Sequence, residues 1–348
     1  MRKKLIFVLV SLATIIILII VAIYIDRKGS GEPKPSPTSS GGKLTLQEGS
    51  LKEKVFFPSM SQDGKSFFYL GDQGVKIKKF SFDSQKVENL YGHEVFFTIQ
   101  AYWSPDKNWV ILKNNDDKAA TPSRLYDLKN GTATEIDPHI QNILWGPDSQ
   151  KIYYQYLDIK TNQNFLATGQ PDGSGREKIV DLQYDNYGLI WLNNYQSIGF
   201  WSIPSDIGGT NLKSVNIKER TIKEIVTDYS LGNALASPDG SYIAYEKFNP
   251  QESNYTVALS RSDGNNATDT GIQSSIGKIA WLDKTTLIIV ARKDNGRTDS
   301  FYKVNVENVQ KTEIGYEPQT GIDAQNLILS DKTLYFTSND ILYSLTLP

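Results

Sequence analysis

Much the same stretch of sequence returns at regular intervals along this chain. The run "YWSPDKNWVILK" at residues 102–113 returns as "LWGPDSQKIYYQ" at 144–155 and as "LASPDGSYIAYE" at 235–246. When the residue before each turn is aligned, successive positions lie 42 to 48 residues apart. These positions are Met60, Trp103, Trp145, Trp191, Ala236, Trp281 and Leu329. The chain after residue 43 is therefore a series of seven repeat units.

Each repeat unit reads as short strands joined by turns. Pro105, Pro147 and Pro238 preset φ at the second position of a turn, and an aspartate follows each proline. Strand-like runs such as 109–113 and 242–248 come next, and no convincing helical spacing of apolar residues follows. A period of roughly 40–45 residues is typical of four-stranded propeller blades. We therefore expect an all-β fold over residues 43–348, a seven-bladed β-propeller of four-stranded antiparallel blades.

The seventh repeat unit contains only three strands before the chain ends. The run "KLTLQ" at residues 43–47 alternates like a strand but has no blade of its own. We expect it to supply the missing outermost strand and close the ring, because closure removes exposed sheet edges. Four of the six tryptophans end a first strand, where we expect them to pack between neighbouring blades.

The first 28 residues form a separate segment. Residues 5–25 carry no charge and are mostly apolar, and as a helix they span roughly 30 Å, the hydrocarbon thickness of a bilayer. The run is longer than the hydrophobic region of a secretory signal peptide, and no small-residue cleavage site follows it. We therefore expect residues 1–28 to be an uncleaved transmembrane signal-anchor. The short leading segment favours a single-pass protein of the cell membrane with the bulk of the chain extracytoplasmic.

A linker rich in Pro, Gly and Ser follows at residues 29–42 and is expected to hold the propeller away from the membrane. The chain carries 37 Lys and Arg against 39 Asp and Glu, so no basic excess indicates nucleic-acid binding. It contains no cysteine, which excludes disulfides, thiolate metal sites and a cysteine nucleophile. No catalytic motif stands out.

The "WSPDK", "WGPDS" and "ASPDG" turns, each followed by a strand of the "IAYEK" kind, resemble the WD40-like propeller repeats of the TolB type. In the second unit, Gly92 and His93 also resemble the Gly-His pair of a true WD repeat, with Tyr126 in place of the Trp. The resemblance covers residues 43–348 and implies a propeller fold. It implies a docking role only loosely, because propellers have many activities.

Neither histidine is a strong candidate for chemistry. For His93 the resemblance implies a structural hydrogen bond across the blade, and His139 is expected near the loop face defined below. With two histidines in separate units and no cysteine, we expect no metal or other cofactor. The runs 261–269 and 292–299 are similar to calcium loops in composition, but they lack the spacing of an EF-hand and are interpreted as hairpin turns.

The loops between second and third strands are long and mixed in charge. In a propeller these loops share one face, here the loop face, with the links between blades, and loops on a rigid scaffold often carry binding residues. The alternative is that they are ordinary solvated loops. The ligand-binding candidates on this face are Asp116, Asp117, Arg292, Lys293, Asp294 and Arg297.

Three functions remain open at this point. The first is a membrane-tethered module that docks a protein, a peptide or a cell-envelope polymer. The second is a hydrolase or lyase that uses carboxylates at the central channel, with or without a divalent metal. The third is a structural subunit of an envelope complex.

Overall fold

The computed structural model describes residues 40–44, 46–48, 51–95, 98–114, 123–203, 209–293, 298–316 and 322–347. The expected membrane segment and residues 29–39 of the expected linker lie outside these ranges. Within them, no helix has the length and apolar character needed to cross a bilayer. The described residues fall in one compact unit that begins at Ser39.

Short strands make up most of this unit, and its helical turns are the 3₁₀ segments η1 (Asp72–Gly74) and η2 (Ile276–Lys278). The strands up to the third repeat unit are β1 (Ser40–Leu44), β2 (Leu46–Glu48), β3 (Phe56–Met60), β4 (Ser66–Gly71), β5 (Lys76–Ser81), β6 (Lys86–Asn89), β7 (Thr98–Trp103), β8 (Trp109–Asn114), β9 (Arg124–Asp127), β10 (Thr132–Glu135), β11 (Ile140–Trp145), β12 (Ile152–Asp158), β13 (Gln163–Gly169) and β14 (Glu177–Asp181). The later strands are β15 (Tyr187–Leu192), β16 (Ser197–Ser202), β17 (Thr210–Asn216), β18 (Ile222–Ala236), β19 (Tyr242–Asn249), β20 (Asn254–Arg261), β21 (Thr268–Gln273), β22 (Ile279–Trp281), β23 (Thr286–Lys293), β24 (Thr298–Asn305), β25 (Lys311–Tyr316), β26 (Gln325–Ser330), β27 (Thr333–Ser338) and β28 (Ile341–Thr346).

Within each repeat unit, strands that follow one another in the chain pair antiparallel. The described residues form the sheets β3–β6, β7–β10, β11–β14, β15–β21, β22–β25 with β1, and β26–β28 with β2. The seven-stranded sheet joins the fourth and fifth repeat units through β18, which pairs with β17 along its first half and with β19 along its second half. The prediction of an all-β fold built from four-stranded antiparallel units is therefore confirmed.

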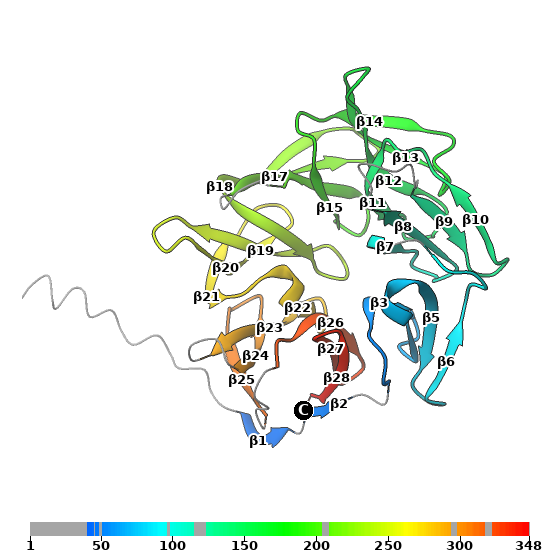
Figure 1. Ribbon diagram of the computed structural model, residues 1–348. Coiled ribbons are helices and arrows are strands. Elements are labelled where there is room, and N and C mark those ends of the chain that lie inside the picture. The colour runs from blue at the N-terminus through cyan, green and yellow to red at the C-terminus, as the bar shows by residue number, and fades with distance from the viewer. Residues whose placement is uncertain are drawn as a thin grey trace, which may run out of the picture. The chain divides into compact units, whose positions relative to one another are not determined.

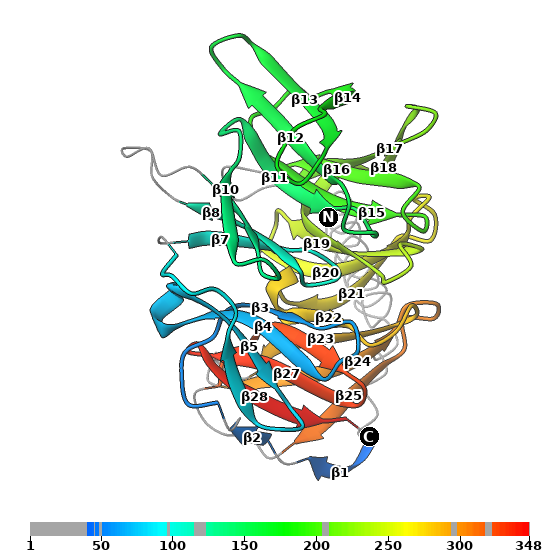
Figure 2. The same cartoon turned by 90° about the vertical axis from the view of Figure 1, so that its right-hand side faces the viewer.

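The sheets of this unit follow one another in chain order around a common axis (Figure 1). The first strands of successive repeat units lie against each other near this axis, as β3 with β7, β7 with β11, and β11 with β15. Contacts of β22 with β26 and of β26 with β3 complete the circuit between the last unit and the first. Figure 2, turned by 90°, shows the same sheets from the side.

The segment before the first repeat unit closes this circuit, as expected, but with different bounds. β2 pairs antiparallel with β28, so Leu46 and Gln47 do complete the last sheet. Lys43 and Leu44 do not, because they belong to β1, which runs parallel to β25 of the preceding sheet. A strand added there covers an edge of β25 that would otherwise present unpaired backbone groups. β1 begins at Ser40, inside the range that we expected to be linker.

Tryptophan side chains connect neighbouring sheets near the axis. The indole Nε1 of Trp103 donates to the carbonyl oxygen of Phe57 at 2.9 Å, and that of Trp145 donates to Tyr102 at 2.9 Å. Trp191 continues the series, since its Nε1 donates to the carbonyl oxygen of Trp145 at 2.8 Å. Each bond runs from one first strand to the first strand of the preceding unit. The predicted position of these tryptophans between neighbouring units is confirmed.

The recurring turn is stabilised by its own side chains. Ser237 Oγ donates to Asp239 Oδ1 at 2.8 Å and accepts the Tyr242 N–H at 3.0 Å, which ties the turn to the next strand. Burial opposes ionisation of Asp239, but hydrogen bonds from Ser241 and Ser237 outweigh it and hold the pKa of Asp239 below its usual value. Equivalent bonds hold the turn at residues 104–109. Local chemistry thus explains why the same short sequence recurs.

We predict that Trp145→Phe destabilises the protein more than Trp281→Phe. Both changes remove the same ring area, but only Trp145 loses a hydrogen bond, and the Tyr102 carbonyl is then left without its donor. The Nε1 of Trp281 is buried and has no hydrogen-bond partner in the described structure. We expect the free energy of unfolding to fall by about 1–2 kcal/mol more for Trp145→Phe. Thermal unfolding of the full-length variants measures this, and equal losses would contradict it.

We also predict that Asp239→Asn destabilises the protein less as the pH falls. A carboxyl whose folded pKa is lowered contributes stability above its unfolded pKa of about 3.9, and this contribution is lost as the pH falls through the folded pKa. The difference in melting temperature between wild type and Asp239→Asn should therefore be largest near pH 6–7 and shrink below about pH 4. A difference that stays constant from pH 7 to pH 3 would rule out this role of the charge.

Candidate functional site

The structure describes the side chain of one of the six residues predicted for ligand binding. Arg292 lies in β23, is 54% exposed, and contacts Asp323 Oδ2 at 3.0 Å. Only the backbone of Lys293 is described, at the end of β23. The other four, Asp116, Asp117, Asp294 and Arg297, lie outside the described residues. The loop-face assignment therefore stays a prediction.

Arg292 belongs to an ion-pair network between the sixth and seventh repeat units. Lys278 Nζ contacts Asp299 Oδ2 at 3.1 Å and also pairs with Asp323. Asp299 is buried and accepts the Ala324 N–H at 2.7 Å. Burial opposes ionisation of Asp323, but its bonds with Lys278 and Arg292 outweigh this and lower the pKa of Asp323. The ion pairs of Lys278 and Arg292 with Asp323 therefore connect the sixth and seventh repeat units.

The histidines lie in different surroundings. His93 is exposed and packs edge-on against Tyr91 with ring centroids 5.6 Å apart, and the described residues show no hydrogen bond across the unit. The implied structural bond is therefore absent from the described structure, because the ring faces solvent. His139 Nδ1 lies 2.7 Å from Asp137 Oδ1. Among the described residues, no three histidine, aspartate or glutamate side chains are grouped so as to hold a metal ion.

The run 261–269 forms the turn between β20 and β21. Asp263 Oδ1 accepts the Asn265 N–H at 2.9 Å, and Gly264 adopts a φ of +86°, which favours glycine. The turn interpretation of this run is confirmed. The second run resembling a calcium loop, 292–299, lies in the β23–β24 hairpin, and residues 294–297 of it lie outside the described structure.

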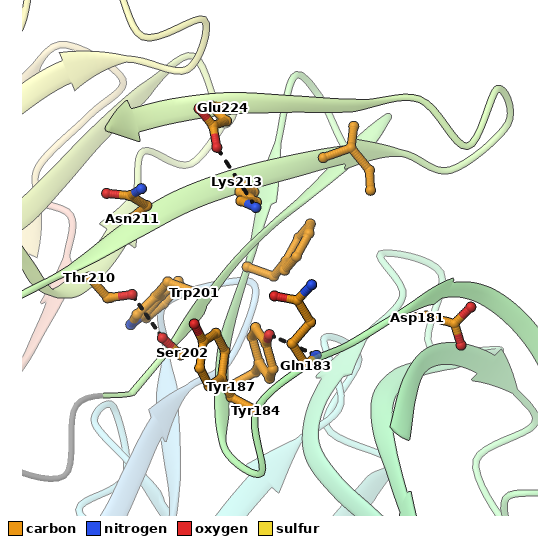
Figure 3. A pocket seen from close by; sticks show the side chains of 12 residues that line it. Asp181, Gln183, Tyr184, Tyr187, Trp201, Ser202, Thr210, Asn211, Lys213 and Glu224 are labelled. Atoms are coloured by element: carbon orange, nitrogen blue, oxygen red, sulfur yellow. Dashed lines mark hydrogen bonds and ion pairs between the residues drawn. The ribbon is translucent and has the colours of Figure 1, made fainter. Parts of the chain in front are cut away.

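Two adjoining cavities lie at the border between the third and fourth repeat units. The first has a volume of about 290 Å³ and the second about 610 Å³, and both are lined by Asp181 and Gln183. The first lies over β15–β18, as Figure 3 shows, and the second lies over β12–β14. We call the two together the Tyr184 groove, defined by the lining residues 157–159, 162–165, 178, 181–185, 187, 200–202, 210, 211, 213, 222 and 224.

Aromatic side chains line the first cavity. Tyr184 is 58% exposed, whereas Tyr187 and Phe200 are buried beneath it. The ring centroids of Tyr184 and Tyr187 are 6.2 Å apart, and those of Tyr187 and Phe200 are 6.0 Å apart. The Gln183 N–H donates to the Tyr187 hydroxyl at 3.2 Å, and burial raises the pKa of Tyr187. The exposed ring therefore rests on a fixed aromatic base.

A buried amide holds the link that carries Tyr184. Gln155 is fully buried, and its Nε2 donates to the Tyr184 carbonyl oxygen at 3.0 Å and to Asn164 Oδ1 at 2.8 Å. Asn164 Nδ2 donates to the same carbonyl at 2.7 Å. Asn142 Nδ2 donates to Gln155 Oε1 at 2.9 Å, so both the nitrogen and the oxygen of the Gln155 amide have hydrogen-bond partners. The link is a loop whose backbone is fixed from below.

Trp201 adds the largest ring to the groove. Its indole lies over Gly188, where an added Cβ would come within about 2.0 Å of the ring, so glycine is required at that position. The Nε1 of Trp201 is buried and has no hydrogen-bond partner within the described structure. Nearby, the Ser202 and Thr210 hydroxyls are 2.8 Å apart and hydrogen-bonded (Figure 3). A buried unpaired donor of this kind is uncommon and costs stability.

Charge in the groove is predominantly negative. Its lining includes four carboxylates and two lysines: Asp158, Asp181, Asp185, Glu224, Lys178 and Lys213. Lys213 lies 3.7 Å from Glu224, and Lys178 pairs with Asp181. Asp158 and Asp185 have no lysine or arginine partner among the described residues.

The groove was not predicted from the sequence. Two signals in the sequence point to it: Trp201 is one of two tryptophans outside the first strands, and Tyr184 is an aromatic residue in a link between units. The hydrogen-bond network of Gln155 could not be seen in the sequence, because it joins residues from four separate segments: β11, β12, β13 and the link that carries Tyr184.

No protein-family model matches the chain, and no curated protein sequence is significantly similar to it. Similar solved structures include an oligogalacturonate lyase in complex with manganese, with a TM-score of 0.63, 14% identity, and coverage of 90% of this chain and 99% of that one. A prolyl endopeptidase has a TM-score of 0.57 and 16% identity over 82% of this chain. TolB from Acinetobacter baumannii has a TM-score of 0.50 and 11% identity over 78% of this chain.

At these identities the similarity shows the fold, a β-propeller, and not the activity. This chain spans 46% of the length of the prolyl endopeptidase and 65% of that of TolB. The neighbours include both enzymes and TolB, so the fold does not decide between catalysis and binding.

We predict that Gln155→Leu loosens the link at residues 182–186. The change removes one of the two amide donors to the Tyr184 carbonyl and one of the two acceptors of the Asn142 amide, and the free energy of unfolding should fall by about 1–3 kcal/mol. The matched control is Gln150→Leu at an exposed turn, which should change it by less than about 0.5 kcal/mol. Thermal unfolding and hydrogen exchange of amides 182–187 measure the effect. Unchanged exchange in the link would contradict the positioning role of Gln155.

Proposed function

We propose that this protein is a docking module that binds an extended partner, a protein, peptide or envelope polymer, in the Tyr184 groove. The observation that carries the proposal is the exposed Tyr184 ring in the lining of the first cavity, on a link whose backbone is held at the Tyr184 carbonyl by the buried Gln155 amide. An exposed aromatic residue on a rigid loop offers contact area at low conformational cost, which is typical of binding surfaces.

The proposed architecture has seven blades. The seven-stranded sheet is interpreted as two four-stranded blades that share β18, because the register of β18 shifts between its pairings with β17 and β19. Seven apolar clusters support this count, since each joins buried residues of two neighbouring repeat units. The TolB-type sequence resemblance agrees with this architecture.

We further propose that residues 5–25 anchor the chain in the cell membrane and that residues 29–42 act as a tether. The propeller would then lie on the extracytoplasmic side. The length and lack of charge of residues 5–25 support the anchor. TolB is similar in fold, and a docking role is consistent with that similarity.

The alternative is a hydrolase or lyase that uses grouped carboxylates. An oligogalacturonate lyase is among the structural neighbours. However, the grouped carboxylates Asp299 and Asp323 are already paired with Lys278 or Arg292. Despite burial, the bonds of Asp323 with Lys278 and Arg292 lower its pKa, which makes it a poor general base. The binding function is therefore the one that the geometry supports better.

Photo-cross-linking tests the docking function. We predict that Tyr184→p-benzoylphenylalanine in the full-length chain, expressed in its native cells, forms a discrete covalent adduct on illumination. The matched control is the same change at Tyr195, which is 44% exposed in the turn between β15 and β16, away from the groove. Adducts at both positions or at neither would contradict docking in the groove.

A further inference from the structure

We propose that the ligand of the Tyr184 groove is a proline-rich peptide segment that carries lysine or arginine. This inference rests on the proposed docking function and names its partner by chemistry.

The ring geometry suits a polyproline helix. Such a helix repeats every three residues, rises about 3.1 Å per residue and leaves its carbonyl groups without internal partners. Aromatic-lined grooves bind it because its conformation is already formed and little entropy is lost. The series of Tyr184, Tyr187 and Phe200, with centroid spacings of 6.2 and 6.0 Å, presents one exposed ring supported by two buried ones. Proline rings can pack against the exposed face.

The unpaired indole gives such a peptide a partner for one carbonyl. Trp201 is 3% exposed and lines the first cavity, and its Nε1 has no acceptor among the described residues. An indole N–H is a donor only, so it requires an acceptor such as a free peptide carbonyl. The nitrogen itself has almost no exposed surface, so a small shift of the side chains around it must accompany binding. Satisfying this donor recovers free energy that the unbound protein lacks.

The charge of the groove favours a basic ligand. Asp158 and Asp185 have no lysine or arginine partner among the described residues and lie in the second cavity, next to the aromatic one. Hydrogen bonds from Thr161 hold the pKa of Asp158 below its usual value, so it stays ionised at neutral pH. A lysine or arginine in the peptide can pair with these carboxylates. A neutral polysaccharide would gain no charge attraction from them, and an anionic one would be repelled.

The direct test is fluorescence anisotropy with the purified full-length chain. The probe is a fluorescein-labelled peptide of three Pro-Pro-Lys repeats, and the control peptides are three Pro-Pro-Glu repeats and three Gly-Ser-Lys repeats. We expect saturable binding of the Pro-Pro-Lys peptide and at least about tenfold weaker binding of both controls. Raising the salt from about 0.05 to 0.5 M should weaken binding, because screening reduces the charge attraction.

Variants locate the binding in the groove. Tyr184→Ala and Asp185→Asn should each weaken binding about fivefold or more, whereas Tyr195→Ala should leave it unchanged. Trp201→Phe should weaken binding without lowering the melting temperature as Trp145→Phe does, because it removes a donor that has no partner in the free protein. Circular dichroism confirms that each variant is folded. Both exposed positions, 184 and 185, can change with little effect on the fold.

Several results would overturn the proposal. Equal affinity for the Pro-Pro-Glu peptide would show that the carboxylates do not select a basic ligand. Unchanged affinity of the Tyr184→Ala variant would show that the peptide does not bind in the Tyr184 groove. Adducts at position 184 in cells together with no affinity for the Pro-Pro-Lys peptide would reject this ligand class and leave the docking function standing. Binding of a neutral oligosaccharide such as cellohexaose in its place would assign the groove to carbohydrate. Absence of adducts at position 184 would reject the docking function itself.

Discussion

The packing of each sheet against its neighbours is the interaction on which the rest of this structure depends. A four-stranded sheet has two faces and two edges, and alone it cannot bury enough apolar surface to be stable. At three first strands the terminal tryptophan reaches the preceding unit and donates its N–H to a first-strand carbonyl there, as Trp145 does with Tyr102. The pairing of β2 with β28 completes the last sheet. No sheet can then shift without breaking contacts on both sides.

This rigid framework allows a loop to carry a fixed binding surface. Links between units are short backbone segments whose polar groups need partners. In the link that carries Tyr184, the buried Gln155 and the neighbouring Asn164 supply these partners from the third unit. The exposed ring is therefore held without a helix or a strand of its own. Its position depends on the packing of two units, so the groove exists only in the assembled ring.

The sequence predicts the fold of this protein well because the turn chemistry is local. The Ser-Pro-Asp turn forms its own hydrogen bonds, and its period sets the length of each unit. The parallel pairing of β1 and the fusion of two units through β18 could not be predicted, because they depend on edges that meet only in the folded ring. Arg292 was correctly read as an exposed charge, but its partner Asp323 comes from the next unit. Pairing across units has no local signature.

Function is better sought where the repeat units differ than where they agree. Residues shared by all units serve packing and turns, so they carry little information about a ligand. The border of the third and fourth units departs from the pattern with an exposed tyrosine in a link and a fully buried glutamine, and it also holds Trp201, whose Nε1, like that of Trp281, has no partner in the described structure. The unpaired donor lowers the stability of an unliganded protein, and the buried glutamine orders a loop that the framework does not need. Their coincidence in one groove is explained more simply by a bound partner than by folding.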